Sequence, residues 1–403
     1  MSTSLVYHAF GVRGYRQVKE SYPKKSIAFH LEHGSGLLRC PACDSEQVVR
    51  RGGVVRTFRT LPVGKKAVTL VISIPRVACK ACGCIRQVHL DFAPPRRSYT
   101  NSFARYVIEL CQCMTLSDVA HHLGVGWDLV KEIEKEHLER HYARPKLAGL
   151  RLIGIDEIAV AKGHRYLTVV LDMQTGAVVF VGDGKDAEAL EPFWRRLRSS
   201  GARIEAVAMD MSPAYRQAVA EHLPQSAIVY DHFHVVKLLN DELSKLRREL
   251  QRDAAKEHKD VLKGIRWLLL KNPDTLDDRH NERERLDEAL RINRPLATAY
   301  YLKEDLRQFW KQPDKSTAAR FLDDWIARAR TADIPTLNTF ATTLETHREG
   351  ILAWYDHPIS NGPLEGTNNK IKTMQRQAYG FRDREFFKLR IYAIHEAKYA
   401  LTG

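Results

Sequence analysis

The chain has 403 residues, of which 44% are hydrophobic, so it can bury a sizeable core and should divide into two or three domains. No stretch reaches the roughly 18 uninterrupted apolar residues of a membrane span. The first residues also lack a long apolar signal segment, so we expect a cytoplasmic protein without a membrane partner. The net charge of +14 favours a polyanionic partner, although a solvated basic surface is a common alternative.

The N-terminal region carries most of the charge and two cysteine pairs. Residues 1–100 hold seventeen Lys and Arg against five Asp and Glu, a net charge of +12. Val and Ile alternate there with Arg and Gly, which predicts short strands joined by turns. The sequences CPAC (40–43) and CKAC (79–82) each offer two thiolates, and four sulfurs satisfy the tetrahedral preference of structural zinc. We therefore predict a zinc-ribbon DNA-binding domain over residues 1–97, with the ligands Cys40, Cys43, Cys79 and Cys82.

The remaining cysteines leave one alternative open. Cys84 could replace Cys82 as a ligand. A redox role would place one Cys-x-x-Cys motif at the start of a helix after a strand, and neither motif has that context. Cys111 and Cys113 fall in a helical pattern, where ordinary small core residues are the better interpretation.

Residues 98–148 follow a segment rich in Pro and Arg, DFAPPRRSYT, which we interpret as a linker. The apolar spacing predicts a helix from Thr115 or Ser117, a turn at 124–126 and a second helix from Trp127. An ordinary helical hairpin explains this segment equally well. Its position after a basic zinc ribbon favours a DNA-binding helix-turn-helix, with Lys131 of the second helix as a candidate DNA contact.

Residues 149–403 have the pattern of an α/β domain. The runs LIGIDEIAV, RYLTVVLDM and AVVFVGDG predict three strands, close enough in sequence for an antiparallel meander. A helix, the strand IEAVAMDM, a second helix and the strand AIVYDHFHVV follow. Residues from about 236 to 350 are helical almost throughout, which predicts a long helical insertion.

Two of these strands carry carboxylates. Asp156 lies within LIGIDEIAV and Asp210 at the end of IEAVAMDM. A carboxylate buried among Ile and Val is costly unless it is paired or binds a metal ion. A third ligand usually comes from a helix, and Glu365 begins one after an Asn-Gly-Pro turn. Three such carboxylates suit two magnesium or manganese ions acting on a phosphodiester.

Each of these acids also has an ordinary interpretation. Glu157 could take the place of Asp156. Asp210 could cap the helix that starts at Ser212 or Pro213. Glu365 complements the dipole of its helix.

The helix that begins near Glu365 continues with amides and cations. Glu365, Asn368, Asn369, Lys372 and Arg376 follow spacings of three and four, so they share a helical face. A helix that brings one metal ligand to a site can lay such side chains along the neighbouring phosphates. We therefore predict DNA contacts for the two Asn residues, Lys372 and Arg376; for the two cations a solvated basic face is the alternative.

Motifs in a fixed order along nearly the whole chain carry a family resemblance. They are CPAC and CKAC, TLSDVAHHLGV, IGIDEIAV, VAMDMSPAY, DHFHVVK and NGPLEGTNNKIK. In these motifs the sequence resembles the ISL-three family of bacterial insertion-sequence transposases, a branch of the DDE transposases with an RNase H-like core. The resemblance implies an α/β RNase H-like catalytic domain over residues 149–403, with the helical insertion at about 236–350.

The resemblance also implies roles for residues. Asp156, Asp210 and Glu365 match the catalytic triad, with no departure from the family pattern. Asp231 and His234 match an Asp-x-x-His signature after the last core strand. His234 would orient a scissile phosphate or a water molecule, and a structural hydrogen bond is its alternative role.

The function implied is that of a DNA transposase. It would bind the terminal inverted repeats of a mobile element as double-stranded DNA, cleave there, and join a 3′-hydroxyl to target DNA. We expect a homodimer associated with the nucleoid, because two DNA ends must be paired. A structure-selective RNase H-like nuclease and a catalytically inactive DNA-binding regulator are the alternatives.

Overall fold

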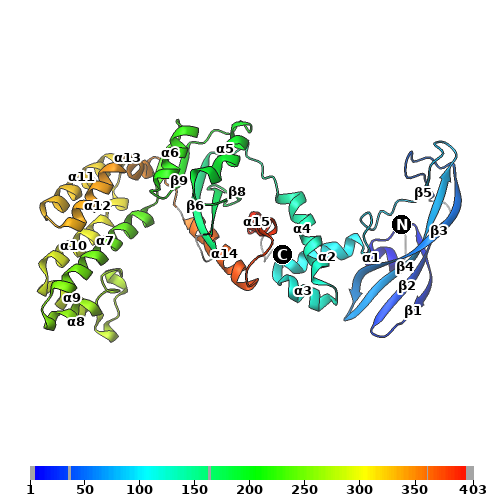
Figure 1. The fold of residues 1–403 in the computed structure, drawn as a ribbon, viewed down its shortest axis with the longest axis horizontal. Helices are drawn as coiled ribbons and strands as arrows, with labels where there is room; N and C mark the ends of the chain where they lie inside the picture. Colours follow the sequence, from blue (N-terminus) through cyan, green and yellow to red (C-terminus); the bar gives the residue numbers. More distant parts are fainter. Residues whose placement is uncertain (1–4, 35–37, 162–164, 361, 396–403) are drawn as a thin grey trace. The chain divides into compact units, whose positions relative to one another are not determined.

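The computed structural model describes residues 5–34, 38–161, 165–360 and 362–395 (Figure 1). They form two compact units. Unit 1 combines the described parts of residues 1–143 and 377–403, and unit 2 comprises those of residues 144–376. Within the described residues, no helix is both long and apolar enough to cross a membrane.

Unit 1 begins with a twisted sheet of order β1-β2-β4-β3, with β5 also paired to β4. The strands β3 and β4 are 16 and 14 residues long, longer than the short strands that the sequence predicted. Two register shifts in β3, at Arg50/Gly53 and Thr60/Val63, let the strand pass its Gly-Gly and Pro positions without ending. The elements are α1 (Leu5–Phe10), β1 (Tyr15–Ser21), β2 (Ser26–His33), β3 (Val48–Val63), β4 (Lys66–Cys79) and β5 (Ile85–Gln87).

A three-helix segment follows in the same unit: α2 (Asn101–Cys113), α3 (Leu116–Leu123) and α4 (Trp127–Tyr142). The Thr115 side chain accepts a hydrogen bond from the backbone N–H of Asp118 and so caps α3. Gly124 ends α3 with φ +62°, a conformation that favours glycine. The predicted helix-turn-helix is confirmed, with its first helix starting after Thr115.

The segment after α14 returns to this helix-turn-helix. Helix α15 (Arg384–Tyr392) packs on α4. Its Arg390 forms an ion pair with the buried Glu134 of α4, and Leu138 packs with Phe386 and Leu389. Burial raises the pKa of Glu134, while the charge of Arg390 lowers it. Helix α15 therefore supplies the counter-charge for a buried acid of unit 1.

Unit 2 is built on a five-stranded sheet of order β10-β9-β6-β7-β8 (Figure 1). The strands β6, β7 and β8 form an antiparallel meander, and β9 and β10 run parallel to β6. This arrangement confirms the predicted RNase H-like core. The strands are β6 (Leu152–Ala161), β7 (Arg165–Asp172), β8 (Val178–Asp183), β9 (Ala206–Met209) and β10 (Ala227–Tyr230).

One face of this sheet packs against α5 (Glu191–Arg198) and α6 (Pro213–His222). The sheet side chains there include Ile153, Ile155 and Met209. The other face carries the alternate residues, among them Ala206 and Ala208. Side chains that alternate along β6 and β9 therefore point to opposite faces, which fixes where the strand carboxylates can lie.

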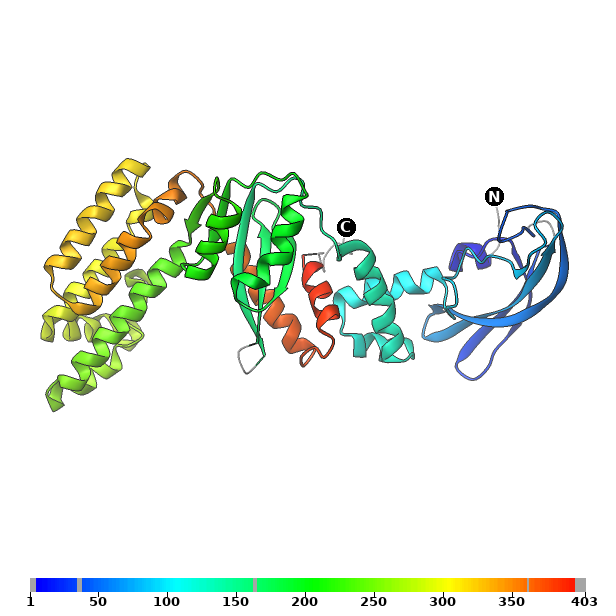
Figure 2. The ribbon, with the colours of Figure 1, turned by 45° about the horizontal axis from the view of Figure 1, so that its top comes forward.

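The helical insertion confirms the sequence prediction, with one boundary corrected. The strand predicted over AIVYDHFHVV ends at Tyr230, and the DHFHVV part is wrong as a strand because α7 begins at His232. Helix α7 places Val235, Leu239 and Leu243 in the core, a helical spacing that continues the period of the insertion. Figures 1 and 2 show the insertion helices gathered in one bundle beside the sheet of unit 2.

The insertion and the return of the chain to the sheet are built from helices and short 3-10 turns. The helices are α7 (His232–Asp253), α8 (Lys256–Gly264), α9 (Glu282–Ile292), α10 (Arg294–Leu306), α11 (Lys315–Thr331), α12 (Pro335–Thr346), α13 (Arg348–Leu352) and α14 (Gly362–Gln377). The 3-10 turns of unit 2 are η2 (Ala187–Leu190), which precedes α5, and η3 (Pro273–Thr275), η4 (Asp278–His280), η5 (Phe309–Lys311) and η6 (Ala353–Tyr355).

The buried ion pair of α15 gives a first prediction. Arg390→Ala should destabilise unit 1 by about 3 kcal/mol, because it leaves Glu134 buried without its counter-charge. Thermal unfolding of the full chain measures the loss, and faster hydrogen exchange in α4 locates it. The control is Glu385→Ala on the same helix, which breaks a 3.2 Å pair with Lys388 whose acid is 73% exposed and should cost less than about 1 kcal/mol. Equal effects of the two changes would contradict the role of Arg390.

Candidate metal centre and carboxylate site

The zinc centre is formed where the β3–β4 hairpin returns the chain to its starting point. Val48 pairs with Cys79 across the two strands, so the knuckle that precedes β3 meets the knuckle that follows β4. The backbone N–H of Lys80 donates to the carbonyl of Gln47 at 2.8 Å, which ties the two knuckles together. The pairing of β3 with β4 thus brings the two knuckles together, although they are far apart in the sequence.

Four thiols lie together at this junction. The ligand atoms of Cys40, Cys43, Cys79 and Cys82 all lie within 4.8 Å of one another. Cys40 Sγ is 3.6 Å from Cys82 Sγ, and Cys43 Sγ is 3.6 Å from Cys79 Sγ. A tetrahedron with Zn–S bonds of about 2.3 Å has edges of about 3.8 Å, so the arrangement fits zinc. The chain therefore has a structural zinc site.

The cysteine side chains shift one another's pKa values, and a bound cation would favour the thiolate form of each. A hydrogen bond from the backbone N–H of Ala42 lowers the pKa of Cys40 to about 6. Its hydrogen bond with Cys40 is the main reason that the pKa of Cys84 is raised to about 12. Cys84 Sγ lies 3.3 Å from Cys40 Sγ but outside the mutually close group of four, so the geometry favours Cys82 as the fourth ligand.

Asp156 and Asp210 come from adjacent parallel strands. Gly154 of β6 pairs with Ala208 of β9, and extending this register by two residues sets Asp156 beside Asp210 on one face of the sheet. Asp210 follows the last residue of β9, and its Oδ1 accepts from the backbone N–H of Ser212 at 2.9 Å. This bond shapes the turn into α6, but the N-cap of that helix is Ser212 and no side chain caps it, so the cap proposed as the alternative role of Asp210 is not formed.

Asp156 is held in place and is largely removed from water. Its Oδ1 accepts from the backbone N–H of Glu157 at 2.8 Å, and its Oδ2 accepts from Nδ2 of Asn368 at 2.7 Å. Burial raises the pKa of Asp156, and the nearby charge of Asp210 raises it further, against the hydrogen bonds and the charge of His234. Such a group fits a cation, because a cation would compensate both the burial and the repulsion.

Helix α14 carries Glu365 along the same face. A Cβ atom added at Gly154 would lie 2.8 Å from Leu364 Cδ1, so glycine is required for this close approach. Asn368 contacts Asp156, and Gln375 donates to the carbonyl of Val160. These three contacts run in the same direction along α14 and β6, which both views draw together (Figures 1 and 2). Glu365 is one helical turn before Asn368 on the same helix.

In the described residues, Asp156, Asp210 and Glu365 do not form one close group of ligand atoms. Glu365 is exposed, and in the described part of the chain the cysteine group alone brings three or more His, Cys, Asp or Glu ligand atoms within 4.8 Å of one another. The side chain of Glu365 would therefore have to turn inward to share an ion with the two aspartates.

His234 faces the two strand aspartates from α7. Its Nδ1 lies 3.3 Å from Oδ2 of the buried Asp231. This interaction with Asp231 is the main reason that the pKa of His234 is raised, and the charges of Asp156 and Asp210 add to it. Burial alone would raise the pKa of Asp231, but hydrogen bonds with His232 and His234 hold it well below its usual range. The structure thus places an imidazole with a raised pKa beside the two aspartates.

Glu157 is a further acid that sequence reasoning treated only as a replacement for Asp156. Its side chain is directed to the opposite face of β6, where it interacts with Tyr215. Tyr215 Oη lies 3.0 Å from Thr168 Oγ1. Burial and the charge of Asp210 raise the pKa of Glu157. The sequence could have indicated Glu157 only through its position next to Asp156. The two acids are adjacent in sequence, but Asp156 contacts Asn368 and Glu157 interacts with Tyr215.

The candidate DNA contacts of α14 divide into two groups. Asn369, Lys372 and Arg376 are exposed, in a stripe that also contains Glu365. Asn368 is buried and belongs to the carboxylate site, which sequence reasoning missed. The sign that could have indicated this is its position between the apolar residues Leu364 and Ile371 on the helix.

Lys131 lies on α4 but is already engaged within unit 1. Its Nζ is 3.0 Å from Oδ2 of Asp383, a carboxylate that Lys135 also contacts at 3.0 Å. The Lys131 ammonium group also lies 5.5 Å from the ring centroid of Trp127. A DNA phosphate would therefore have to compete with Asp383 for Lys131.

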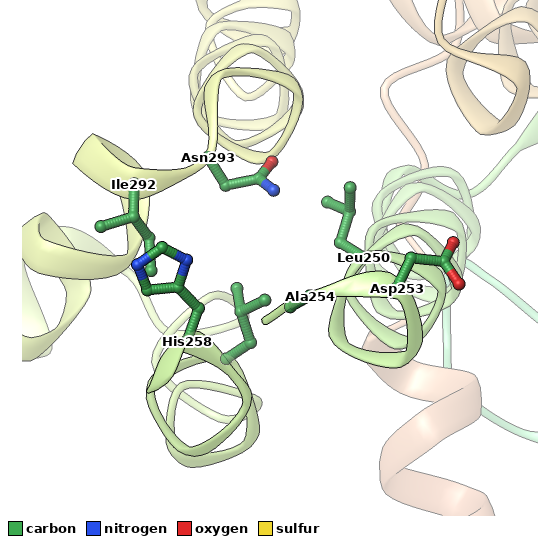
Figure 3. A pocket seen from close by; sticks show the side chains of 7 residues that line it. Leu250, Asp253, Ala254, His258, Ile292 and Asn293 are labelled. Carbon is green, nitrogen blue, oxygen red and sulfur yellow. The ribbon is translucent and has the colours of Figure 1, made fainter. Parts of the chain in front are cut away.

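A pocket in the helical insertion lies apart from these groups (Figure 3). It opens between the end of α7, α8 and the α9–α10 junction, and neither the strand aspartates nor Glu365 line it. Its lining residues are Leu250, Asp253, Ala254, His258, Leu262, Ile292 and Asn293.

Comparisons with known proteins match the whole series of domains. The zinc-finger of transposase IS204/IS1001/IS1096/IS1165 matches residues 37–82, the helix-turn-helix domain of transposase family ISL3 matches residues 88–138, and a family model described as transposase matches residues 153–391. The first match ends at Cys82 and excludes Cys84.

Curated relatives extend the similarity over the chain. The transposase for insertion sequence element IS1001 of Bordetella parapertussis is 34% identical over 390 residues, covering 95% of this chain and 96% of the relative. The transposase for insertion sequence element IS1557 of Mycobacterium tuberculosis (strain H37Rv) is 31% identical over 372 residues, covering 86% and 83%. A chain of the Drosophila P element transposase strand transfer complex has a TM-score of 0.39 at 10% identity, covering 74% of this chain and 92% of that chain, a likeness too low to establish a shared fold.

An RNase H-like core with a preceding zinc ribbon and helix-turn-helix defines a DNA transposase of the DDE class. The chain belongs to transposase family ISL3. The family and the enzyme class expected from the sequence motifs are thereby confirmed.

The zinc centre gives a second prediction. Cys40→Ser should lower the zinc content from about one ion per chain to near zero, because three thiolates hold zinc far less tightly than four. Mass spectrometry under native conditions measures the content. Cys113→Ser, an exposed cysteine of α2, is the control and should keep its zinc. Cys82→Ser should behave like Cys40→Ser, and Cys84→Ser like the control; the reverse pattern would assign Cys84 as the ligand.

The partly buried Asp156 gives a third prediction, which depends on pH. The folded pKa of Asp156 lies above the ordinary value of 3.8, so its contribution to stability is present below that value and is lost as pH rises through the folded pKa. In EDTA at pH 7, Asp156→Asn should therefore unfold a few degrees higher than wild type, with the gap closing toward pH 4.

The same comparison in Mn²⁺ provides the second half of the test. Wild type should gain roughly 2–3 kcal/mol at a hundredfold excess over Kd, and Asp156→Asn should gain much less. Asp260→Asn, an exposed position on α8, is the control and should follow wild type. If Asp156→Asn is less stable than wild type in EDTA at every pH, the charged form of Asp156 does not destabilise the fold as argued.

Proposed function

We propose that this transposase binds the terminal inverted repeats of its element and cuts and joins DNA strands at a site formed by Asp156, Asp210 and Glu365. The hydrogen bond from Asn368 to Asp156 is the main support, because it sets the helix of Glu365 against the strand of Asp156. The register of β6 and β9 supports the inclusion of Asp210.

The proposed reaction has two steps of the same type. First, a water oxygen forms a bond to phosphorus at the element end, and the bond to the 3′ oxygen breaks. The departing oxygen takes up a proton and becomes a 3′-hydroxyl. Second, that hydroxyl loses its proton, attacks a phosphorus of the target DNA and displaces the target's 3′ oxygen. Both steps are in-line displacements at phosphorus, so one site can serve both.

The residues of the chain contribute position and charge. Two Mg²⁺ or Mn²⁺ ions held by the three carboxylates would activate the attacking oxygen and stabilise the leaving one. The backbone N–H of Glu157 fixes one oxygen of Asp156. His234, whose pKa is raised by its interaction with Asp231, would donate a hydrogen bond to a non-bridging phosphate oxygen and so orient the scissile group.

Exposed side chains of α14 would contact the DNA next to the site. The exposed stripe of Asn369, Lys372 and Arg376 has the amide and cationic groups that bind phosphates without reading sequence. In unit 1, Lys131 would bind a phosphate by exchanging Asp383 for it. The zinc ribbon, with its net positive charge, and the helix-turn-helix would bind the terminal repeats.

A homodimer is part of the proposal, because two element ends must be held together for joining and each chain supplies one such carboxylate set. We also propose that the active protein is associated with the nucleoid, because both of its substrates are double-stranded DNA.

The fourth prediction tests the catalytic residues. Asp156→Asn, Asp210→Asn and Glu365→Gln should each reduce cleavage of a terminal-repeat duplex by about 10³-fold, about 4 kcal/mol of transition-state stabilisation. Binding of the same duplex should stay within a few-fold of wild type. Asp260→Asn is the control and should cleave normally.

Strand transfer separates the candidate functions. A transposase should join the cleaved end to a target plasmid in Mg²⁺ or Mn²⁺, whereas a structure-selective nuclease would cleave branched DNA without joining. Tight binding by wild type with no cleavage in either metal would indicate a DNA-binding regulator and would contradict the proposed site.

A further inference from the structure

Asn368 is an unusual residue for its position. It lies on the buried side of α14, between Leu364 and Ile371, and is itself buried. An amide in such a place costs free energy unless both its N–H and its carbonyl groups find partners. A leucine there would continue the apolar face without that cost, so packing alone does not explain the amide.

Only half of the amide is satisfied by protein groups. Nδ2 donates to Asp156 Oδ2 at 2.7 Å. Among the described residues, no hydrogen-bond donor reaches the buried Oδ1. A buried acceptor without a donor costs roughly 1–3 kcal/mol. Within the described residues the oxygen is therefore left open to a partner from outside them.

The surroundings indicate what kind of partner this is. Asp156 is in contact with the same side chain, Asp210 is beside Asp156 on the sheet, and Glu365 is one turn earlier on the same helix. A region so rich in carboxylates attracts a divalent cation, for which a neutral amide oxygen is a suitable hard ligand. A neutral ligand also adds coordination without adding to the repulsion among the acids.

We propose that Asn368 is a fourth polar member of the cation site: Nδ2 positions Asp156, and Oδ1 supplies a neutral oxygen to the divalent cation. This inference rests on the carboxylate site of the proposed function and extends it. It also separates Asn368 from Asn369, which is exposed and remains a candidate DNA contact.

The test measures binding of Mn²⁺ to the full-length, zinc-loaded protein in the absence of DNA. Electron paramagnetic resonance of free Mn²⁺ gives the affinity, and Asp156→Asn identifies the fraction bound at the carboxylate site. Asn368→Leu removes both the donor and the oxygen, and should weaken Mn²⁺ binding about 10–100-fold. Asn369→Leu, the adjacent exposed position, is the matched control and should bind as wild type does.

A second variant keeps the inference testable if Asn368→Leu does not fold. Asn368→Asp retains an oxygen at each position but turns the donor toward Asp156 into another acceptor. It should bind Mn²⁺ at least as tightly as wild type, and it should be less stable than wild type in EDTA and recover in Mn²⁺. A purely structural role for Asn368 predicts no recovery.

The outcomes separate this inference from the proposal beneath it. Mn²⁺ affinity of Asn368→Leu within twofold of wild type, or loss of Mn²⁺ binding in Asn368→Asp, would overturn the role of Asn368 and leave the three carboxylates in place. Wild type that binds no Mn²⁺ sensitive to Asp156→Asn would overturn the carboxylate site itself.

Discussion

The contact of α14 with β6 is the constraint on which the arrangement of the catalytic unit depends. It joins segments about two hundred residues apart in sequence, with the whole helical insertion between them. Gly154 allows the close approach, and the Asn368–Asp156 and Gln375–Val160 contacts fix the direction and register. Without this packing, the helix that carries Glu365 would not lie along the strand that carries Asp156.

The chain accepts a cost in stability at this position. Asp156 and Glu157 are both raised in pKa by burial and by the charge of Asp210, so the folded protein holds acids in places that disfavour their charged forms. The same property prepares the region for cations and for the negative charge of DNA, because each positive ion removes repulsion that is already present. The zinc centre likewise brings four ionisable groups close together, here thiols, and a bound cation would stabilise their charged forms.

The sequence predicted the elements and their order well, because each strand and helix is marked by its own local period and by its caps. The core strands, the turn at Gly124 and the cysteine knuckles belong to this class. The sequence did not predict that Asn368 is buried beside Asp156, that Lys131 is paired with Asp383, or that Arg390 compensates Glu134. These are contacts between distant segments, and no local pattern encodes which buried charge meets which partner. The end of β10 was wrong for a local reason, since DHFHVV contains Phe and two Val residues that favour strands, but Asp231 is the N-cap residue of α7.

The most direct test of the central claim is anomalous diffraction from crystals of the full chain grown with Mn²⁺ and a terminal-repeat duplex. We expect Mn²⁺ peaks bounded by Asp156 and Asp210, with the Glu365 side chain turned inward to join them and the oxygen of Asn368 directed at one ion. Peaks on the other face of β6, held by Glu157 without Asp156, or an absence of peaks near all three carboxylates, would contradict the proposed site.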